Sequence, residues 1–264
     1  MSLVIEKDAP WALVTGATGG LGLQFCELLA ARGYRLVITA RDTARLAEMR
    51  ELIPQAQLAL AGDLTDHVCL KNLLNHLKRE NIEPEVLINN AGFGLYGETL
   101  EQNRAENINL VDLNVRALTT LTLALAPSMR AKRKGYILNV ASIAAFMPCP
   151  YLSVYGASKA YVLSFSEALH EELKTEGVHV TALCPGPVKT NFWNRAGVSE
   201  CDRFEFAITD ARSVAERGLS ALFKNKALAT YGILNKVLTV SAQLAPKGLT
   251  RLIAKEVLRL AVKK

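Results

Sequence analysis

Short apolar runs alternate with longer segments of helical spacing from Trp11 onward, and this alternation limits the fold more than any other feature of the chain. Most runs are apolar at nearly every position, which is typical of parallel strands with both faces buried. We expect strands at Trp11–Thr15, Arg35–Ala40, Gln57–Leu60, Val86–Asn89, Gly135–Ala141, His179–Cys184 and Ala227–Tyr231. We expect helices at residues 20–32, 43–52, 66–80, 102–132, 152–175 and 208–223. Because crossovers between parallel strands are right-handed, this order predicts an α/β fold: a doubly wound parallel sheet of about seven strands with helices on both faces.

Length and composition agree with one globular unit. The chain has 264 residues, of which 50% are apolar, and this is enough to cover a sheet on both faces. No repeat, low-complexity tract or Gly/Ser linker marks a domain boundary. We therefore expect a single domain over residues 1–264, with a core at about 10–233 and a C-terminal helical extension at about 234–264.

The cysteines and the N-terminal segment predict a cytoplasmic protein. Five widely spaced cysteines without a C-x-x-C pair favour reduced thiols. The N-terminal segment lacks the pattern of a secretory signal, and the longest apolar run covers about half of the ~20 residues that a bilayer crossing needs. No transmembrane helix is expected. The four histidines are dispersed, so no metal site is expected either.

The formal charge of +6 is concentrated at the C-terminal end. Residues 1–221 hold 22 basic and 24 acidic residues, whereas residues 222–264 hold nine basic residues and one acidic residue, Glu256. Helical spacing there places apolar and basic residues on different faces: Leu249, Leu252, Ile253, Val257 and Leu260 on one, and Arg251, Lys255 and Arg259 on another. Such a helix packs on its own domain or a second subunit, or lies peripherally on an anionic membrane. Nucleic acid is not expected as a partner, because the body is slightly acidic and shows no DNA-binding motif.

A glycine-rich turn joins the first predicted strand to the first predicted helix. Its residues are Thr15, Gly16, Ala17, Thr18, Gly19, Gly20, Leu21 and Gly22. Residues without a Cβ let the backbone approach a pyrophosphate, while the helix N-terminus directs free N–H groups towards the phosphates. The same glycines would also serve a tight turn that only packs the helix against the strand. The position after the first strand favours nucleotide binding, because open α/β sheets bind ligands at such turns.

The end of the second predicted strand indicates which dinucleotide binds. An acidic residue there would bind the ribose 2′-hydroxyl and repel a 2′-phosphate. Here Ala40 ends the strand, Arg41 follows it, and Arg45 comes one helical turn later. A guanidinium matches a phosphate in charge and in geometry. The sequence therefore favours NADP(H) over NAD(H), although Arg45 would equally fit a solvated helix face.

Tyr155 and Lys159 stand four residues apart, which places a phenol and an ammonium on one face of a predicted helix. A nearby cation favours the phenolate, so we expect Lys159 to lower the pKa of Tyr155 towards neutrality. Ser142 lies thirteen residues upstream, at the C-terminal end of an apolar strand, where such sheets place their ligands.

At these residues the chain closely resembles the short-chain dehydrogenase/reductase family, over about residues 10–233. The matching motifs, in chain order, are Thr15–Gly22, Asp63-Leu64, Asn89-Asn90-Ala91-Gly92, Asn114, Ser142, the Tyr155/Lys159 pair, and Pro185-Gly186 with Thr190. The resemblance implies a Rossmann-like fold and a hydride transfer between a nicotinamide and a carbonyl or secondary alcohol. It also implies a homodimer or homotetramer.

The resemblance assigns roles to individual residues. Ser142, Tyr155, Lys159 and Asn114 would form the catalytic tetrad, with Tyr155 as general acid/base, Lys159 holding the nicotinamide ribose and Asn114 positioning a water. The cofactor would be bound by Gly16, Thr18, Gly19, Gly20, Leu21, Gly22, Arg41, Arg45, Asp63, Leu64, Asn90, Ala91, Gly92, Tyr155, Lys159, Pro185, Gly186, Val188 and Thr190. Asp63 would contact the adenine, and Thr190 the nicotinamide carboxamide.

The expected substrate pocket is apolar and aromatic rather than cationic. Its candidate residues are Ser142, Ala144, Met147, Cys149, Tyr155, Phe192 and Trp193, with residues 191–207 as a loop or lid. Such a lining favours a hydrophobic ketone, aldehyde or secondary alcohol, including steroid- or lipid-like molecules. The alternative is a catalytically silent NADP(H)-binding sensor or scaffold on the same fold, although the usual sign of one, a lost Ser, Tyr or Lys, is absent here.

Overall fold

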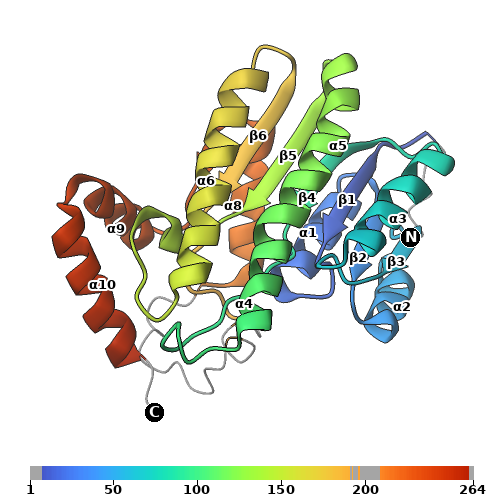
Figure 1. Ribbon diagram of the computed structural model, residues 1–264. Coiled ribbons are helices and arrows are strands. Elements are labelled where there is room, and N and C mark those ends of the chain that lie inside the picture. The colour runs from blue at the N-terminus through green and yellow to red at the C-terminus, as the bar shows by residue number, and fades with distance from the viewer. Residues whose placement is uncertain (1–7, 191, 193–195, 197–208, 262–264) are drawn as a thin grey trace.

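A seven-stranded parallel sheet forms the centre of the molecule in a computed structural model, which describes residues 8–190, 192, 196 and 209–261 (Figure 1). The strands are β1 (Trp11–Thr15), β2 (Arg35–Ala40), β3 (Leu58–Ala61), β4 (Pro84–Asn89), β5 (Gly135–Val140), β6 (Val178–Leu183) and β7 (Leu228–Ala229). Their order across the sheet is β3-β2-β1-β4-β5-β6-β7, and every adjacent pair is parallel. The predicted Rossmann-like, doubly wound α/β fold is confirmed.

Helices cover both faces of this sheet. They are α1 (Gly20–Ala30), α2 (Thr43–Leu52), α3 (His67–Arg79), α4 (Arg104–Val111), α5 (Leu118–Ala131), α6 (Ser153–Leu173) and α8 (Ala211–Phe223), with α9 (Ile233–Leu244) and α10 (Lys247–Ala261) at the end. One core cluster joins α1, α2 and α8 to the sheet, and a second joins α3, α5 and α6 to its other face. In Figure 1, α5 and α6 lie in front of the strands and α8 lies behind them.

Strand β1 shows why the sequence predicted buried strands well. Ala12 and Val14 belong to the core on one face, while Leu13 belongs to the core on the other, and all three are fully buried. A strand covered on both faces needs apolar side chains at every position, so the run is continuous. The predicted limits of β1 and β2, the end of β4 and the start of β5 are correct, and the other strand limits differ by one or two residues.

The predicted helix at 102–132 is interrupted. It begins at Arg104, and the segment Asp112–Ala117 (η1) between α4 and α5 is a π-helical turn. Asn114 lies within this turn and is 1% exposed. Such turns inside α-helices occur frequently at functional sites.

By length and composition alone, the helical stretch Arg104–Ala131 could cross a membrane. Its residues Leu121 and Met129, however, are buried in the core cluster shared with α3 and α6. Packing in this core against the sheet therefore accounts for the apolar character of this helix.

The candidate site lies at the point where the strand order reverses. β1 lies between β2 and β4, so the chain that leaves β1 and the chain that leaves β4 diverge at the same edge. Ligands of open α/β sheets bind outside the carboxyl ends of the strands at such a switch point. The glycine-rich turn follows β1 and Asn90 follows β4, and the two therefore meet there.

The C-terminal extension is helical, as expected, and consists of α9 and α10. Both lie at one side of the molecule, apart from α1, α2 and α3 (Figure 1). The division into a core and an extension stays a prediction.

Candidate active site

The glycine-rich turn is clamped to the end of β4 by side chains. The Thr15 hydroxyl accepts hydrogen bonds from the backbone N–H groups of Asn90 and Ala91, each at 3.0 Å. The Asn90 amide donates to the carbonyl oxygens of Thr15 and Gly16, also at 3.0 Å. The family resemblance assigned Asn90 to the cofactor site, and the structure places it against the glycine-rich turn.

Gly16 and Gly22 of the turn have no room for a side chain because backbone atoms lie too close. Gly16 has φ +63°, and a Cβ on it would lie 2.9 Å from the Cα of Ala91. A Cβ on Gly22 would lie 2.1 Å from the carbonyl oxygen of Gly16. Helix α1 then begins after Gly19, which offers no side chain to cap the first N–H groups. The sequence left open whether these glycines serve close packing or nucleotide binding. The two roles are compatible, because the packed turn leads into a helix N-terminus whose N–H groups have no side-chain cap and can bind phosphate.

Arg41 and Asp63 meet beyond the ends of β2 and β3. A nitrogen of Arg41 lies 3.9 Å from a carboxylate oxygen of Asp63, and both side chains are about half exposed. The other carboxylate oxygen of Asp63 accepts from the backbone N–H of Thr65. Arg45 lies in the first turn of α2, which Asp42 caps. A cation therefore stands where the sequence placed the contact with a ribose phosphate.

Ser142 and Tyr155 lie together although they come from different elements. Ser142 follows β5 and caps the short 3-10 helix η2 (Ile143–Phe146) by accepting from the N–H of Ala144 at 3.1 Å. Tyr155 lies in the first turn of α6, is 9% exposed, and forms a side-chain hydrogen bond with Ser142. The capping role and the catalytic role proposed for Ser142 can thus coexist.

Lys159 and Asn114 extend this group inward. Lys159 is 5% exposed, and its ammonium donates to the carbonyl oxygen of Val140 at 2.8 Å. The Asn114 amide donates to the Phe93 carbonyl oxygen and to the Ser158 hydroxyl, each at 3.0 Å. A Cβ on Gly92 would lie 3.0 Å from the Asn114 amide oxygen and 3.4 Å from the Lys159 nitrogen. The residues of the predicted tetrad therefore converge, with Gly92 between two of them.

The pKa of Tyr155 moves opposite to the expectation. Burial raises it from the ordinary 10.0 to about 12, although the hydrogen bond with Ser142 opposes the rise. Burial also lowers the pKa of Lys159 from 10.5 to about 8. The Lys159 ammonium lies 5.7 Å from the centre of the Tyr155 ring and is engaged by Val140. The expected lowering by Lys159 is therefore not found in this arrangement, because loss of water around the phenolate is the largest effect and the one opposing effect comes from Ser142.

The chain after β6 returns to the glycine-rich turn. A Cβ on Gly20 would lie 2.6 Å from the methyl carbon of Thr190, so the two segments are in contact. Val188 pairs with Thr209 as an isolated bridge. Gly186 packs against Asn235 of α9, whose amide nitrogen would lie 2.5 Å from a Cβ at that position. The structure therefore brings Thr190, though not Gly186, against the residues proposed to hold the phosphates.

An apolar wall surrounds Tyr155. Its buried members are Leu110, Cys149, Leu152 and Tyr155, and its partly buried members are Phe93, Leu95, Tyr96, Ala144, Met147, Val154, Phe192 and Leu258. Burial raises the pKa of the Cys149 thiol to about 11, so this group is an uncharged part of the wall at neutral pH. Ala144, Met147, Cys149 and Phe192 thus lie where the sequence placed them. Trp193 and the rest of the 191–207 loop, apart from Phe192 and Ala196, fall outside the described residues.

Comparison with known proteins decides the family. The model of the short chain dehydrogenase family matches residues 10–200. The chain belongs to the short chain dehydrogenase family.

Individual relatives are similar over most of the chain. A protein from Haemophilus influenzae named "Probable NADP-dependent dehydrogenase" is 36% identical over 176 residues, which cover 66% of this chain and 70% of that protein. A Rattus norvegicus protein named "Very-long-chain 3-oxoacyl-CoA reductase" is 34% identical over 186 residues, covering 68% and 60% of the two chains. A solved short-chain dehydrogenase from Sphingobium yanoikuyae in complex with NADPH has a TM-score of 0.78 and 30% identity, and the match covers 97% of each chain.

In this short chain dehydrogenase, the structure gives roles near the candidate site to three residues for which the sequence analysis gave none. Thr15 anchors β4, and Ser158 links Asn114 to the Tyr155 carbonyl oxygen through a 2.7 Å hydrogen bond. Ser158 lies next to Lys159 in the Tyr155–Lys159 motif, so its position on the helix was a signal for it. Leu258 reaches the wall from α10, far away in sequence, and no local pattern could have indicated it.

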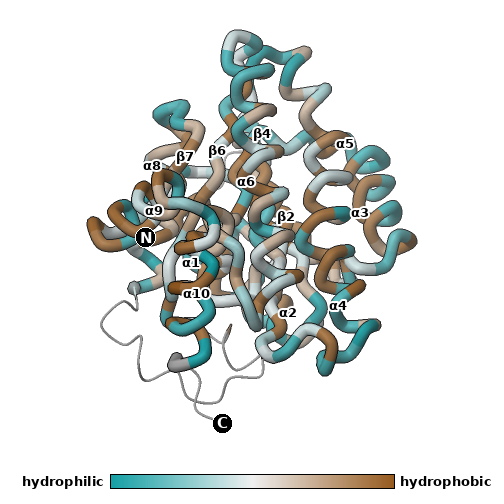
Figure 2. The backbone as a smooth tube through the Cα atoms, turned by 60° about the vertical axis from the view of Figure 1, so that its left-hand side comes forward, coloured by the Kyte–Doolittle hydropathy of each residue, from teal (hydrophilic) through white to brown (hydrophobic). Residues whose placement is uncertain are grey.

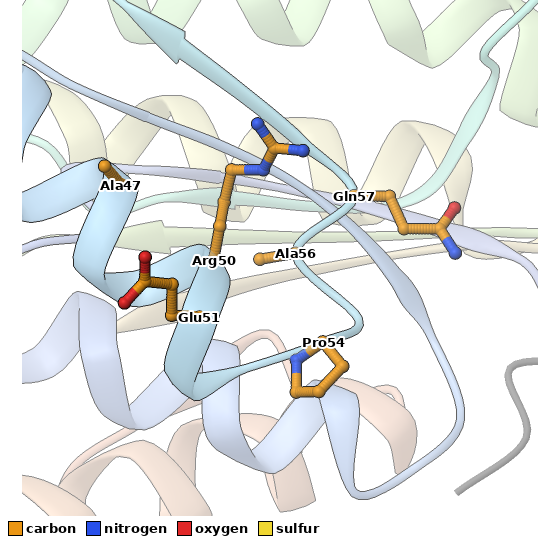
Figure 3. A pocket seen from close by; sticks show the side chains of 6 residues that line it. All are labelled: Ala47, Arg50, Glu51, Pro54, Ala56 and Gln57. Carbon is orange, nitrogen blue, oxygen red and sulfur yellow. The ribbon is translucent and has the colours of Figure 1, made fainter. Parts of the chain in front are cut away.

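The dehydrogenase also has a hollow between α2 and the chain that follows it (Figure 3). It measures about 520 Å³ and is lined by Ala47, Arg50, Glu51, Pro54, Ala56 and Gln57. None of these side chains belongs to the glycine-rich turn or to the Ser142–Tyr155 group. We therefore place the chemistry at the converging side chains rather than at this hollow.

Proposed function

We propose that this short chain dehydrogenase uses NADP(H) to reduce the carbonyl group of a hydrophobic substrate, or to oxidise the corresponding alcohol. The observation that carries the proposal is the group of Ser142, Tyr155, Lys159 and Asn114 beside an apolar wall. The Haemophilus relative, named "Probable NADP-dependent dehydrogenase", and the Sphingobium relative, solved in complex with NADPH, support the choice of cofactor.

The residues present fit a dinucleotide cofactor. Gly16 and Gly22 keep side chains out of the turn, and the first N–H groups of α1 have no side-chain cap. These groups would hold the pyrophosphate. Arg41 would bind the 2′-phosphate, and Asp63 would orient the Arg41 guanidinium. Lys159 and Thr190 would contact the nicotinamide half of the cofactor.

The chemistry follows from the protonation states of the side chains. The nicotinamide, when bound, supplies or accepts the hydride at the carbonyl carbon. With a pKa of about 12, Tyr155 is a protonated phenol at neutral pH and can donate its proton to the carbonyl oxygen. Ser142 would donate a hydrogen bond to the same oxygen as negative charge develops there. A protonated Tyr155 at neutral pH favours carbonyl reduction over alcohol oxidation.

The substrate class follows from the wall around Tyr155. Its side chains are mainly Leu, Phe, Tyr, Met and uncharged Cys. A lining of this kind would bind apolar groups, with a few polar atoms to orient the reacting group. The resemblance to a protein named a very-long-chain 3-oxoacyl-CoA reductase supports a long-chain or lipid-like carbonyl.

A panel of carbonyl compounds tests this proposal. NADPH oxidation should be measured with straight-chain aldehydes and ketones of increasing length, with bulky cyclic ketones, and with small charged keto acids. We expect the specificity constant to rise with apolar size and to be lowest for the keto acids. Turnover restricted to small charged substrates would overturn the substrate class, and NADPH binding without turnover of any compound would support the silent sensor or scaffold.

Removal of the Arg41 guanidinium should change the cofactor preference. We expect Arg41→Ala to raise the dissociation constant of NADPH by about 10- to 100-fold, since hydrogen bonds between charged groups contribute about 1.5–3 kcal/mol. NADH binding should change little, because NADH has no 2′-phosphate. Fluorescence titration with both cofactors measures this, with Arg50→Ala at the far end of α2 as the control. Equal weakening of NADPH and NADH would contradict the assignment.

The pKa of Lys159 predicts an alkaline limb in the pH profile. Because this pKa is lowered to about 8, the ammonium loses its proton above pH 8, whereas Tyr155 keeps its proton to about pH 12. We expect kcat/KM for NADPH, which reports groups of the free enzyme, to fall about tenfold per pH unit above 8. Lys159→Arg should move this limb to higher pH, since arginine stays charged. A profile that stays flat to pH 10 would exclude Lys159 as the controlling group.

A further inference from the structure

Helices α9 and α10 expose most of their large apolar side chains. The described chain exposes seventeen large hydrophobic side chains, and ten of them lie on these two helices: Ile233, Leu234, Val237, Leu238, Val240, Leu244, Leu249, Leu252, Ile253 and Val257. Their exposed fractions run from 43% at Leu238 to 82% at Ile233 and Leu244. In Figure 2, where the backbone is coloured by residue hydropathy, α9 contains stretches of hydrophobic residues. We call these ten residues the outer apolar face.

Apart from Leu258 of α10, which packs against the wall around Tyr155, the side of each helix that faces the protein consists of small or polar residues. Asn235 and Thr239 are the buried residues of α9, and Thr250 and Ala254 of α10 are 8% and 6% exposed. Asn235 packs against Gly186 and donates to the carbonyl oxygen of Tyr231. Packing on the domain therefore does not account for the outer apolar face. The described residues of the predicted stripe, Leu249, Leu252, Ile253 and Val257, are exposed, so packing on its own domain is not observed, whereas the second-subunit and membrane alternatives stay predictions. Contiguous exposed patches of this kind mark interaction surfaces.

The charge around the outer apolar face is strongly positive. The basic residues of the described part of α9 and α10 are Lys236, Lys247, Arg251, Lys255 and Arg259. Glu256 is the one acidic residue in these two helices, and it lies 2.7 Å from Arg259 in an ion pair. Two such surfaces brought together would repel each other, whereas an anionic surface complements them.

We propose that the outer apolar face docks on the surface of an anionic lipid bilayer. Its apolar side chains would enter the boundary between headgroups and acyl chains, and the flanking cations would face the anionic headgroups. Leu258, on α10, belongs to the apolar wall around Tyr155, and its carbonyl oxygen accepts a hydrogen bond from the Tyr96 hydroxyl. The helix that would touch the lipid is therefore in contact with the candidate active site.

Vesicle co-sedimentation of the full chain tests the proposal independently of activity. We expect the wild-type protein to sediment with phosphatidylcholine vesicles that contain phosphatidylserine, and less with phosphatidylcholine alone. Ile233→Ser combined with Leu244→Ser should weaken binding about a hundredfold, because two large apolar side chains leave the interface. The matched control is Leu52→Ser with Leu100→Ser, which removes two side chains that are 77% and 96% exposed elsewhere.

The cations are tested in the same assay. Lys247→Gln and Arg251→Gln should each weaken binding to the anionic vesicles about fivefold, as expected for one basic residue near a charged bilayer. Lys71→Gln and Lys78→Gln on α3 serve as controls and should change nothing. Thermal unfolding and turnover of a short water-soluble carbonyl should be the same in all variants, which shows that each one is folded.

Three outcomes would overturn the proposal. The wild-type protein could stay in the supernatant with both kinds of vesicle. The Ile233/Leu244 variant could bind as well as the wild type does. Light scattering could instead show a dimer that this variant dissociates, without vesicle binding by either protein, and the face would then be a contact between two copies of the chain.

Discussion

Tyr155→Phe is expected to lower kcat for carbonyl reduction by about 10²- to 10⁴-fold, the usual contribution of a general acid. The substitution removes only the hydroxyl that hydrogen-bonds with Ser142. The ring should keep its place, because it packs against Phe192 with ring centres 5.3 Å apart and lies close to Gly94. The dissociation constant of NADPH should therefore stay nearly unchanged. NADPH oxidation gives kcat, and a fluorescence titration gives the dissociation constant.

Helix α6 supplies a matched control for this substitution. Tyr161 lies on the same helix, is 40% exposed, and shares a hydrogen bond with Thr119. Tyr161→Phe makes the same chemical change outside the Ser142 group and should leave kcat unaltered. If Tyr155→Phe retained full turnover, the phenol would not be the proton donor. If both variants lost activity equally, the effect would be structural.

Lys159→Met should change the pH dependence of stability as well as abolish efficient turnover. The folded-state pKa of Lys159 is about 8, below the ordinary 10.5. Between these values the unfolded chain binds more protons at this position than the folded chain does, so stability rises with pH. Below pH 8 the buried ammonium costs folding about 3 kcal/mol relative to an unperturbed lysine, and the cost disappears as pH rises to about 10.5.

Methionine has no charge to bury, so the variant lacks this pH-dependent cost. We compare the free energy of unfolding of the variant with that of the wild type. We expect the difference, variant minus wild type, to be largest at pH 7 and to fall by about 3 kcal/mol by pH 10.5. Denaturant titrations of both proteins without cofactor at several pH values measure the difference. Comparing the pH dependence removes the constant cost of losing the hydrogen bond to Val140. A difference that does not vary with pH would contradict the lowered pKa.

The sequence predicted the sheet because burial on both faces requires continuous apolar runs, as in β1. It predicted Tyr155 and Lys159 as neighbours because a spacing of four places them on one helical face. The glycine-rich turn was predicted from its place after the first strand, and Asn90 from the family resemblance; the structure joins the two by hydrogen bonds. Apart from Asn90, the information was local or periodic.

Properties that depend on packing could not be predicted in this way. The pKa of Tyr155 rises because the folded chain removes water from around it, and spacing alone carries no measure of burial. Leu258 reaches the wall of the candidate site only because α10 folds back along it. The orientation of α9 and α10, with Asn235 and Thr239 inward and leucine outward, reverses the usual pattern of amphipathic helices. The cytoplasmic location and the homodimer or homotetramer stay predictions.

Transfer of deuterium from labelled NADPH tests the central claim most directly. NADPH carrying deuterium on either face of nicotinamide C4 should be incubated with the enzyme and the best hydrophobic ketone of the panel. We predict that deuterium from one of the two labelled forms appears on the carbinol carbon of the product, and that Tyr155→Phe slows this transfer by about 10²- to 10⁴-fold. Tight NADPH binding with no deuterium in any product would contradict the account and leave a protein that binds the cofactor without using it.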